Sequence, residues 1–141
     1  MWTVVTFVTP DTLNAVLDAN DVPDEPVVFV IDVDGDDYHL WKALHRQPLV
    51  VVIEYNGALP LGRDNISVPR YRGDVGPGSS LGTLKALAAT HGYRLVHTSF
   101  SGVNAFFVRG DVAEGFDGLR VPRQAANHFN TGTGAFAPAW V

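Results

Sequence analysis

The segment VVFVIDVDGDD, residues 27–37, contains the pattern that decides the predicted fold. It begins with five apolar residues that do not alternate with polar ones, and it continues with acidic residues around a glycine. An apolar run of this length is typical of a strand covered on both faces, as in the parallel sheets of α/β proteins. We therefore predict a buried strand at residues 27–31 that delivers the carboxylates after it to one edge of a sheet.

A second segment, LVVVI at residues 49–53, repeats this pattern and again ends in an acid, Glu54. Between the two segments, Leu40, Trp41 and Leu44 recur at the spacing of one helix face. Two strands joined by a helix are expected to run parallel, through a right-handed crossover. The sequence therefore predicts an α/β unit in which both strands end in acidic residues at the same edge.

The remaining periodic segments extend this unit to an expected three-layer, Rossmann-like α/β domain at residues 1–120, followed by an irregular tail at residues 121–141. The expected sheet is reduced and mostly parallel, has about five strands, and ends in a C-terminal antiparallel hairpin. A strand at the N-terminus is expected to pair beside residues 27–31. The assignments are strands at residues 2–8, 93–97 and 105–109, helices at residues 10–20 and 80–91, and a long loop, the predicted lid, at residues 56–79.

The size and composition of the chain limit the classes of protein that it can belong to. Its 141 residues suit one domain, and no apolar run approaches the length of a membrane span. Because residues 1–20 contain no Lys or Arg to begin a signal peptide, we expect a cytoplasmic location and no membrane partner. The absence of cysteine excludes disulfides, thiolate metal sites and a cysteine nucleophile.

The charged residues divide unevenly along the chain. Residues 1–41 hold nine acidic side chains and no Lys or Arg, whereas residues 42–141 hold six acidic and ten basic ones. The acidic part disfavours nucleic acid as a partner, and it suits either a divalent cation or an internal network with arginine. A solvated acidic face is the simpler alternative.

Four polar residues follow the two central strands, at the edge where open α/β sheets bind ligands. They are Asp32, Asp34, Glu54 and Asn56. Carboxylates gathered at one edge repel one another unless a cation lies among them, and oxygen ligands suit magnesium. We therefore predict that these four residues bind a divalent cation. The alternatives are that Asp32 bonds the backbone amides of its turn, and that Asp34, Asp36 and Asp37 only cap the next helix.

Two other candidate catalytic groups occur later in the chain. The pattern Gly78-Ser79-Ser80-Leu81-Gly82 matches a hydrolase nucleophile elbow, but no strand leads into it, so we predict that Ser79 or Ser80 caps the following helix. His97 is expected at the end of a strand, and we take it as the candidate catalytic base.

Three segments carry a resemblance to a known family: IDVDGDDYHLWKAL at residues 31–44, PLVVVIEYNGALP at residues 48–60, and SLGTLKALAATHGYRLVHTSFSGVNAFFVRGDV at residues 80–112. Together they resemble the C-terminal half of class I S-adenosylmethionine-dependent methyltransferases, in particular FkbM-like bacterial proteins, over residues 3–115. The resemblance implies that Asp32 and Glu54 end the fourth and fifth strands of that fold. It also implies that Asp32, Glu54 and Asn56 match the residues that hold a divalent ion in metal-dependent members.

The sequence lacks the glycine-rich turn with which this family binds the methyl donor. The resemblance therefore implies a methyltransferase-like domain that acts on a small molecule only if missing sequence or another chain supplies the S-adenosylmethionine site. The alternative is a non-catalytic binding or assembly module derived from the same fold. In either case the loss of neighbouring strands leaves a sheet edge exposed, which a homodimer or another partner chain is expected to cover.

Overall fold

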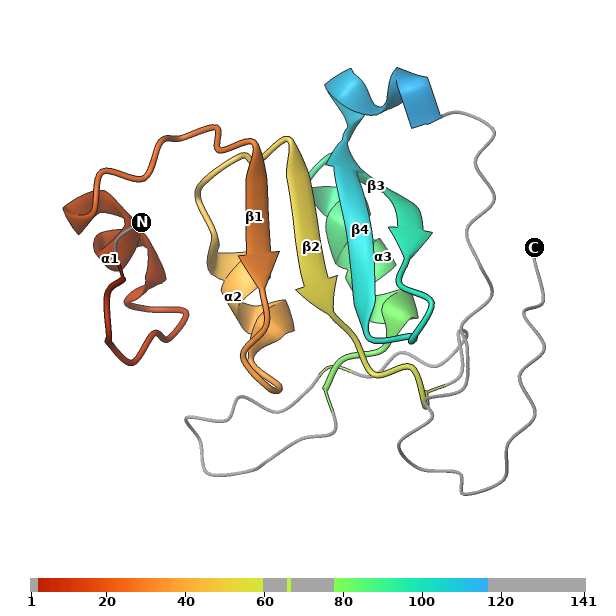
Figure 1. The fold of residues 1–141 in the computed structure, drawn as a ribbon, viewed down its shortest axis with the longest axis horizontal. Coiled ribbons are helices and arrows are strands. Elements are labelled where there is room, and N and C mark those ends of the chain that lie inside the picture. Colours follow the sequence, from red (N-terminus) through yellow and green to blue (C-terminus); the bar gives the residue numbers. More distant parts are fainter. Residues whose placement is uncertain (1–2, 60–65, 67–77, 117–141) are drawn as a thin grey trace.

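The computed structural model describes residues 3–59, 66 and 78–116 (Figure 1). The predicted boundary between residues 120 and 121, the tail, and most of the predicted lid lie outside these residues. In chain order the elements are α1 (Leu13–Ala19), β1 (Val28–Ile31), α2 (Asp37–Ala43), β2 (Val50–Glu54), α3 (Leu81–Thr90), β3 (Tyr93–Thr98), β4 (Asn104–Arg109) and the 3₁₀-helix η2 (Gly110–Phe116).

The sheet has four strands in the order β1-β2-β4-β3. β1 and β2 pair in parallel, and β4 pairs antiparallel with both β2 and β3 (Figure 1). The predicted helix between the first two strands and the predicted antiparallel hairpin are therefore confirmed. The hairpin places β4 beside β2 and leaves β3 at the edge of the sheet.

The expected five-stranded, mostly parallel, Rossmann-like sheet is wrong. The part of the chain that the structure describes has one parallel pair, and its other pairs are antiparallel. The reason is the position of the hairpin, because its second strand inserts beside β2 and makes antiparallel ladders on both of its sides. Strand propensity within each segment does not specify which neighbour a strand takes.

The prediction of a strand at residues 2–8 that pairs beside β1 is also wrong for residues 3–8, which the structure describes. These residues form no strand, and β1 pairs with β2 alone among the described residues. Val5 and Phe7 are largely exposed, whereas Val8 packs against the core. Residues 3–8 thus contribute the side chain of Val8 to the core and add no strand to the sheet.

One face of the sheet carries the main core, because α2 and α3 both pack against it (Figure 1). Trp41 of α2 lies on Phe107 of β4, with ring centroids 4.8 Å apart, and Leu84 of α3 is fully buried in the same cluster. The strands contribute alternate residues to this core, as the two-residue period of a strand requires. The buried strand residues are Ile31, Val51, Ile53, Tyr93, Ala105 and Phe107.

The opposite face, here called the second face, is formed by Val28, Val30, Val50, Val52, Phe106 and Val108. At one end Ala113 of η2 packs against Val96 and Val108. Towards β1 the face is open in the described part of the chain, since Val28 is 50% exposed and Val30 64%. Among the described residues β1 is therefore covered on one face only, because both packed helices lie on that side of the sheet, and the predicted cover of the second face is not formed by this part of the chain.

Two arginines tie the acidic N-terminal part to the rest of the fold, as the uneven charge distribution suggested. Arg46 forms ion pairs with Asp18 and Asp24. Arg109 of β4 bonds Glu25 at 2.6 Å and Asp111 at 2.7 Å. The internal arginine network is thus present, and it fixes the loop that leads into β1.

The start and the end of α3 agree with the sequence prediction. Ser80 is the N-cap, and its hydroxyl oxygen accepts a hydrogen bond from the Thr83 amide at 3.2 Å. Gly92, which follows the C-cap residue His91, adopts a φ of +77°, a value that residues other than glycine rarely adopt. The serine of the apparent hydrolase motif is therefore a structural cap.

Replacing Ser80 with alanine is expected to lower the free energy of unfolding by about 1 kcal/mol, because the Thr83 amide loses its acceptor at a buried position. Chemical denaturation measures this change. Ser101→Ala, at an exposed site in the β3–β4 turn, serves as the matched control and is expected to leave stability nearly unchanged. Equal losses in the two variants would contradict the capping role of Ser80.

Candidate functional site

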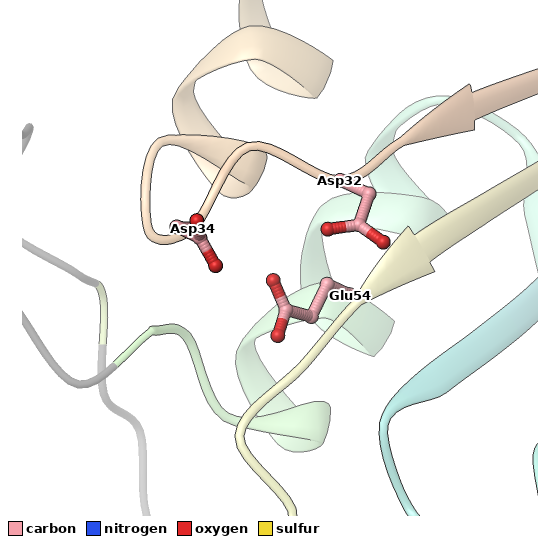
Figure 2. Close-up of side chains that lie close together, drawn as sticks. All are labelled: Asp32, Asp34 and Glu54. Carbon is pink, nitrogen blue, oxygen red and sulfur yellow. The ribbon is translucent and has the colours of Figure 1, made fainter.

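The candidate site lies where β1 and β2 end side by side. Ile31 pairs with Ile53 in the parallel ladder, so the next residues, Asp32 and Glu54, leave the sheet at the same edge. Figure 2 shows the carboxylates of Asp32, Asp34 and Glu54 turned towards a common space from the end of β1, the β1–α2 turn and the end of β2. The predicted juxtaposition of acids from two strands is therefore present.

Asp34 reaches this space because of the backbone conformation of the β1–α2 turn. Asp34 has a φ of +54°, and Gly35, which follows it, has a φ of +121°. Aspartate and glycine tolerate such positive values better than most residues do, and Asp-Gly is a common turn dipeptide. The turn folds the chain back so that α2 begins at Asp37, two residues after the glycine.

Asp37 holds this turn in place. Asp37 is buried, with an exposed fraction of 4% for the whole residue. Its two carboxylate oxygens accept hydrogen bonds from the Val33 amide at 3.1 Å and the Gly35 amide at 2.9 Å. Burial raises the pKa of Asp37, while these backbone bonds act in the opposite direction. The alternative prediction was that Asp32 bonds the backbone amides of this turn. These amides instead donate their hydrogen bonds to Asp37.

The prediction that Asp36 and Asp37 serve as helix caps needs correction. Asp36 is the N-cap residue of α2, but its side chain makes no capping hydrogen bond to the helix. Asp37 is the first residue of the helix, and its carboxylate points back to the turn. The signal that could have revealed this role is the Asp34-Gly35 pair, which predicts a tight turn with amides that need an acceptor.

The three carboxylates of the cluster are close enough to share one cation. Asp32, Asp34 and Glu54 each offer an oxygen, and these oxygens lie within 4.8 Å of one another. Oxygens on opposite sides of one ion are about 4.2 Å apart for magnesium and about 4.8 Å apart for calcium. Calcium fits the present spacing, and magnesium requires only a small approach of side chains that are exposed or half-buried.

The electrostatic environment of Glu54 also favours a cation. Burial, as the largest cause, together with the neighbouring charges of Asp37, Asp32 and Asp34, raises the pKa of Glu54 to about 7. Each charged neighbour that contributes to this shift is a carboxylate. A divalent ion among these groups would replace their mutual repulsion with attraction.

The other two predicted site residues have different surroundings. The Asn56 side-chain oxygen accepts a hydrogen bond from the Ala58 amide at 2.9 Å and so helps to close a turn. His97 is exposed on the edge strand β3, and its ring contacts Phe106. Since β4 separates β3 from β2, His97 lies about 10 Å or more from the β2 strand. The roles of Asn56 as a ligand and of His97 as a base stay predictions.

No family model, curated protein or solved structure matches this chain. The resemblance to methyltransferases therefore stays a prediction from the quoted motifs. None of the helices in the described residues has the length and apolar character needed to cross a membrane.

Proposed function

We propose that this chain binds a divalent cation, for which magnesium is taken as the test ion, through Asp32, Asp34 and Glu54. The observation that carries the proposal is the convergence of three carboxylates from two strand ends and one turn, within 4.8 Å of one another. The raised pKa of Glu54 supports it, since the charged form of this group is disfavoured until a positive charge is present. The bound ion would orient a small polar molecule at the edge of the sheet.

The resemblance to methyltransferases extends this proposal to a substrate and a reaction. A metal-bound hydroxyl of a small molecule would be the group that receives the methyl, in a cytoplasmic reaction. The donor site would be supplied elsewhere, by further sequence or by another chain, because the glycine-rich donor motif does not occur in these 141 residues. Within this chain the proposed contribution is cation binding and substrate positioning.

A non-catalytic binding module is the second candidate, and the position of His97 favours it. The candidate base is exposed on β3 and packs on Phe106, two strands away from the β2 end that carries Glu54. A module of this kind would keep the cation and the ligand but would need no base beside them.

Calorimetric titration of the full chain with magnesium at pH 8 tests the cation site. Asp32→Asn and Glu54→Gln are each expected to lower the affinity at least about tenfold, because each removes a charged ligand. Glu114→Gln provides the matched control, since it removes an exposed acid from η2, and it is expected to bind as the wild type does. Addition of S-adenosylmethionine to the metal-loaded chain is expected to give no further heat.

Two results would contradict the proposal. Equal weakening in all three variants would indicate a diffuse acidic face, which attracts cations by its total charge. Binding that is unchanged in Asp32→Asn and Glu54→Gln would place the ion elsewhere. Asp37→Ala is unsuitable as a control because its carboxylate holds the turn that carries Asp34.

A further inference from the structure

A groove with a volume of about 640 Å³ lies between α2 and α3, the two helices that cover one face of the sheet. Tyr38 and Lys42 of α2 form one wall, and Thr83, Leu87 and Thr90 of α3 form the other. Pockets for small molecules commonly have volumes of about 300–1,000 Å³. The groove is therefore large enough for a small organic ligand, and its lining is separate from the three carboxylates of the cation cluster.

The spacing of residues along the two helices explains why these side chains share one groove. Tyr38 and Lys42 are four residues apart, so they lie one turn apart on the same face of α2. Thr83, Leu87 and Thr90 follow the same spacing on α3. From Thr83 to Thr90 the helix rises about 10 Å. The groove can thus hold an elongated molecule of about this length.

Lys42 and Thr90 lie at the same end of the groove. Trp41 near the end of α2 stacks on His91, the C-cap residue of α3, with ring centroids 6.4 Å apart. The C-terminal ends of the two helices are therefore neighbours, and Lys42 and Thr90 adjoin these two residues in sequence. Tyr38, in the first turn of α2, lines the opposite end.

Two polar groups of the groove are available to a ligand. Within the part of the chain that the structure describes, the Lys42 ammonium forms no ion pair and the Tyr38 hydroxyl forms no hydrogen bond. The hydroxyls of Thr83 and Thr90, by contrast, already have partners in α3 and its cap. Lys42 and Tyr38 are therefore the groups that can bind a polar part of a ligand.

The helices that form the groove are basic, although the whole chain has a net charge of -5. Asp37 is the single acidic residue of α2 and α3, and it is buried with its carboxylate bonded to the β1–α2 turn. The exposed charged side chains of these two helices are those of Lys42 and Lys85. The electrostatic character of the groove thus complements an anion.

We propose that the groove between α2 and α3 binds a small monocarboxylate with an apolar body, such as an aryl-substituted or alkyl carboxylic acid. The carboxylate lies at Lys42, whose single positive charge matches a single negative charge. The apolar body extends along Leu87, which is buried, and Ala86, which is exposed, towards the ring of Tyr38. Ile66 supplies a further apolar side chain to the lining.

Titration of the full chain with phenylbutyrate, followed by the amide NMR signals, tests this site. The signals of Tyr38, Lys42, Ala86 and Thr90 are expected to shift and to reach saturation. A chelator is present throughout, so the result does not depend on the proposed cation site. Shifts that do not saturate, or that occur only outside the groove, would overturn the proposal.

The role of Lys42 is tested with a charge-removing variant and a neutral ligand. Lys42→Gln is expected to weaken phenylbutyrate binding about fivefold, the upper range for a partly exposed ion pair. Lys85→Gln removes the other exposed charge of these helices and is expected to bind as the wild type does. Phenylbutanol, which lacks the charge, is expected to bind the wild type and Lys42→Gln equally. Equal weakening of phenylbutyrate binding in both variants would indicate a diffuse positive surface, and the proposal would be wrong.

Filling the groove provides a test that does not depend on charge. Ala86→Trp places a large side chain in the groove from an exposed position of α3 and is expected to abolish binding of both ligands. Ala89→Trp is the matched control, because Ala89 is exposed on the same helix and lies outside the lining. This variant is expected to bind as the wild type does. Equal binding by the two tryptophan variants would place the ligand elsewhere and overturn the proposal.

Discussion

Replacing Asp37 with alanine is expected to lower the free energy of unfolding by about 2 kcal/mol, the larger of the two stability losses predicted for single substitutions. The carboxylate accepts hydrogen bonds from the Val33 and Gly35 amides, and alanine would leave both donors without this acceptor. An unsatisfied buried amide costs roughly 1–3 kcal/mol. The loss is reduced because the variant also removes an acid that burial disfavours in its charged form.

The same substitution is expected to weaken magnesium binding, although Asp37 is not a proposed ligand. Asp34 keeps its φ of +54° only while the turn is held, and its carboxylate would leave the cluster once the turn relaxes. Urea denaturation and magnesium calorimetry of the variant measure the two effects. Asp37→Asn is the informative comparison, because its single amide oxygen can retain one of the two bonds. A variant as stable as the wild type would show that the turn does not need this carboxylate.

Raising the pH from 5 to 8 in the absence of divalent ions is expected to lower the free energy of unfolding by about 1 kcal/mol through Glu54. Its pKa is about 7 in the folded chain and near 4.5 when unfolded, so between these values the folded state binds more protons. The contribution is complete below pH 4.5 and is lost as the pH rises through about 7. The expected change in unfolding free energy is well below the free energy that corresponds to the full pKa shift of Glu54. The reason is that solvent screens the charge of a half-buried group.

Magnesium is expected to reverse this loss at pH 8. A ligand at about 100 times its dissociation constant stabilises the folded state by about 2.7 kcal/mol, provided that it does not bind the unfolded chain. At pH 5 the stabilisation is expected to be much smaller, because a protonated Glu54 is a poor ligand. Urea denaturation at both pH values, with and without magnesium, measures the four free energies.

Glu54→Gln is the control for this pH dependence. The variant cannot titrate at position 54, so its stability profile between pH 5 and 8 is expected to be flatter, with little response to magnesium. A residual decline in the same direction is expected from Asp37, whose pKa burial also raises. A wild-type profile that rises from pH 5 to 8, with no response to magnesium, would contradict both the titration and the proposed cation site.

The sequence alone determined the features that depend on residues close together in the chain. The apolar runs before Asp32 and Glu54 predicted β1 and β2, and Leu40, Trp41 and Leu44 predicted the helix between them. Ser80 was identified as a cap because N-caps need a side-chain oxygen within a few residues of the amides that they bond. The acids at two strand ends were also predicted, since parallel strands joined by a helix end at the same edge.

The tertiary structure alone decided how these local elements pair. Contacts between residues distant in sequence place β4 beside β2 and leave residues 3–8 without a strand partner. Such contacts also leave Val28 and Val30 exposed among the described residues. The same is true of the pKa of Glu54, which depends on how deeply the folded chain buries that carboxylate and on acids that follow another strand. Strand pairing and desolvation are decided by competition among distant segments for the same surface, and local propensity does not contain that information.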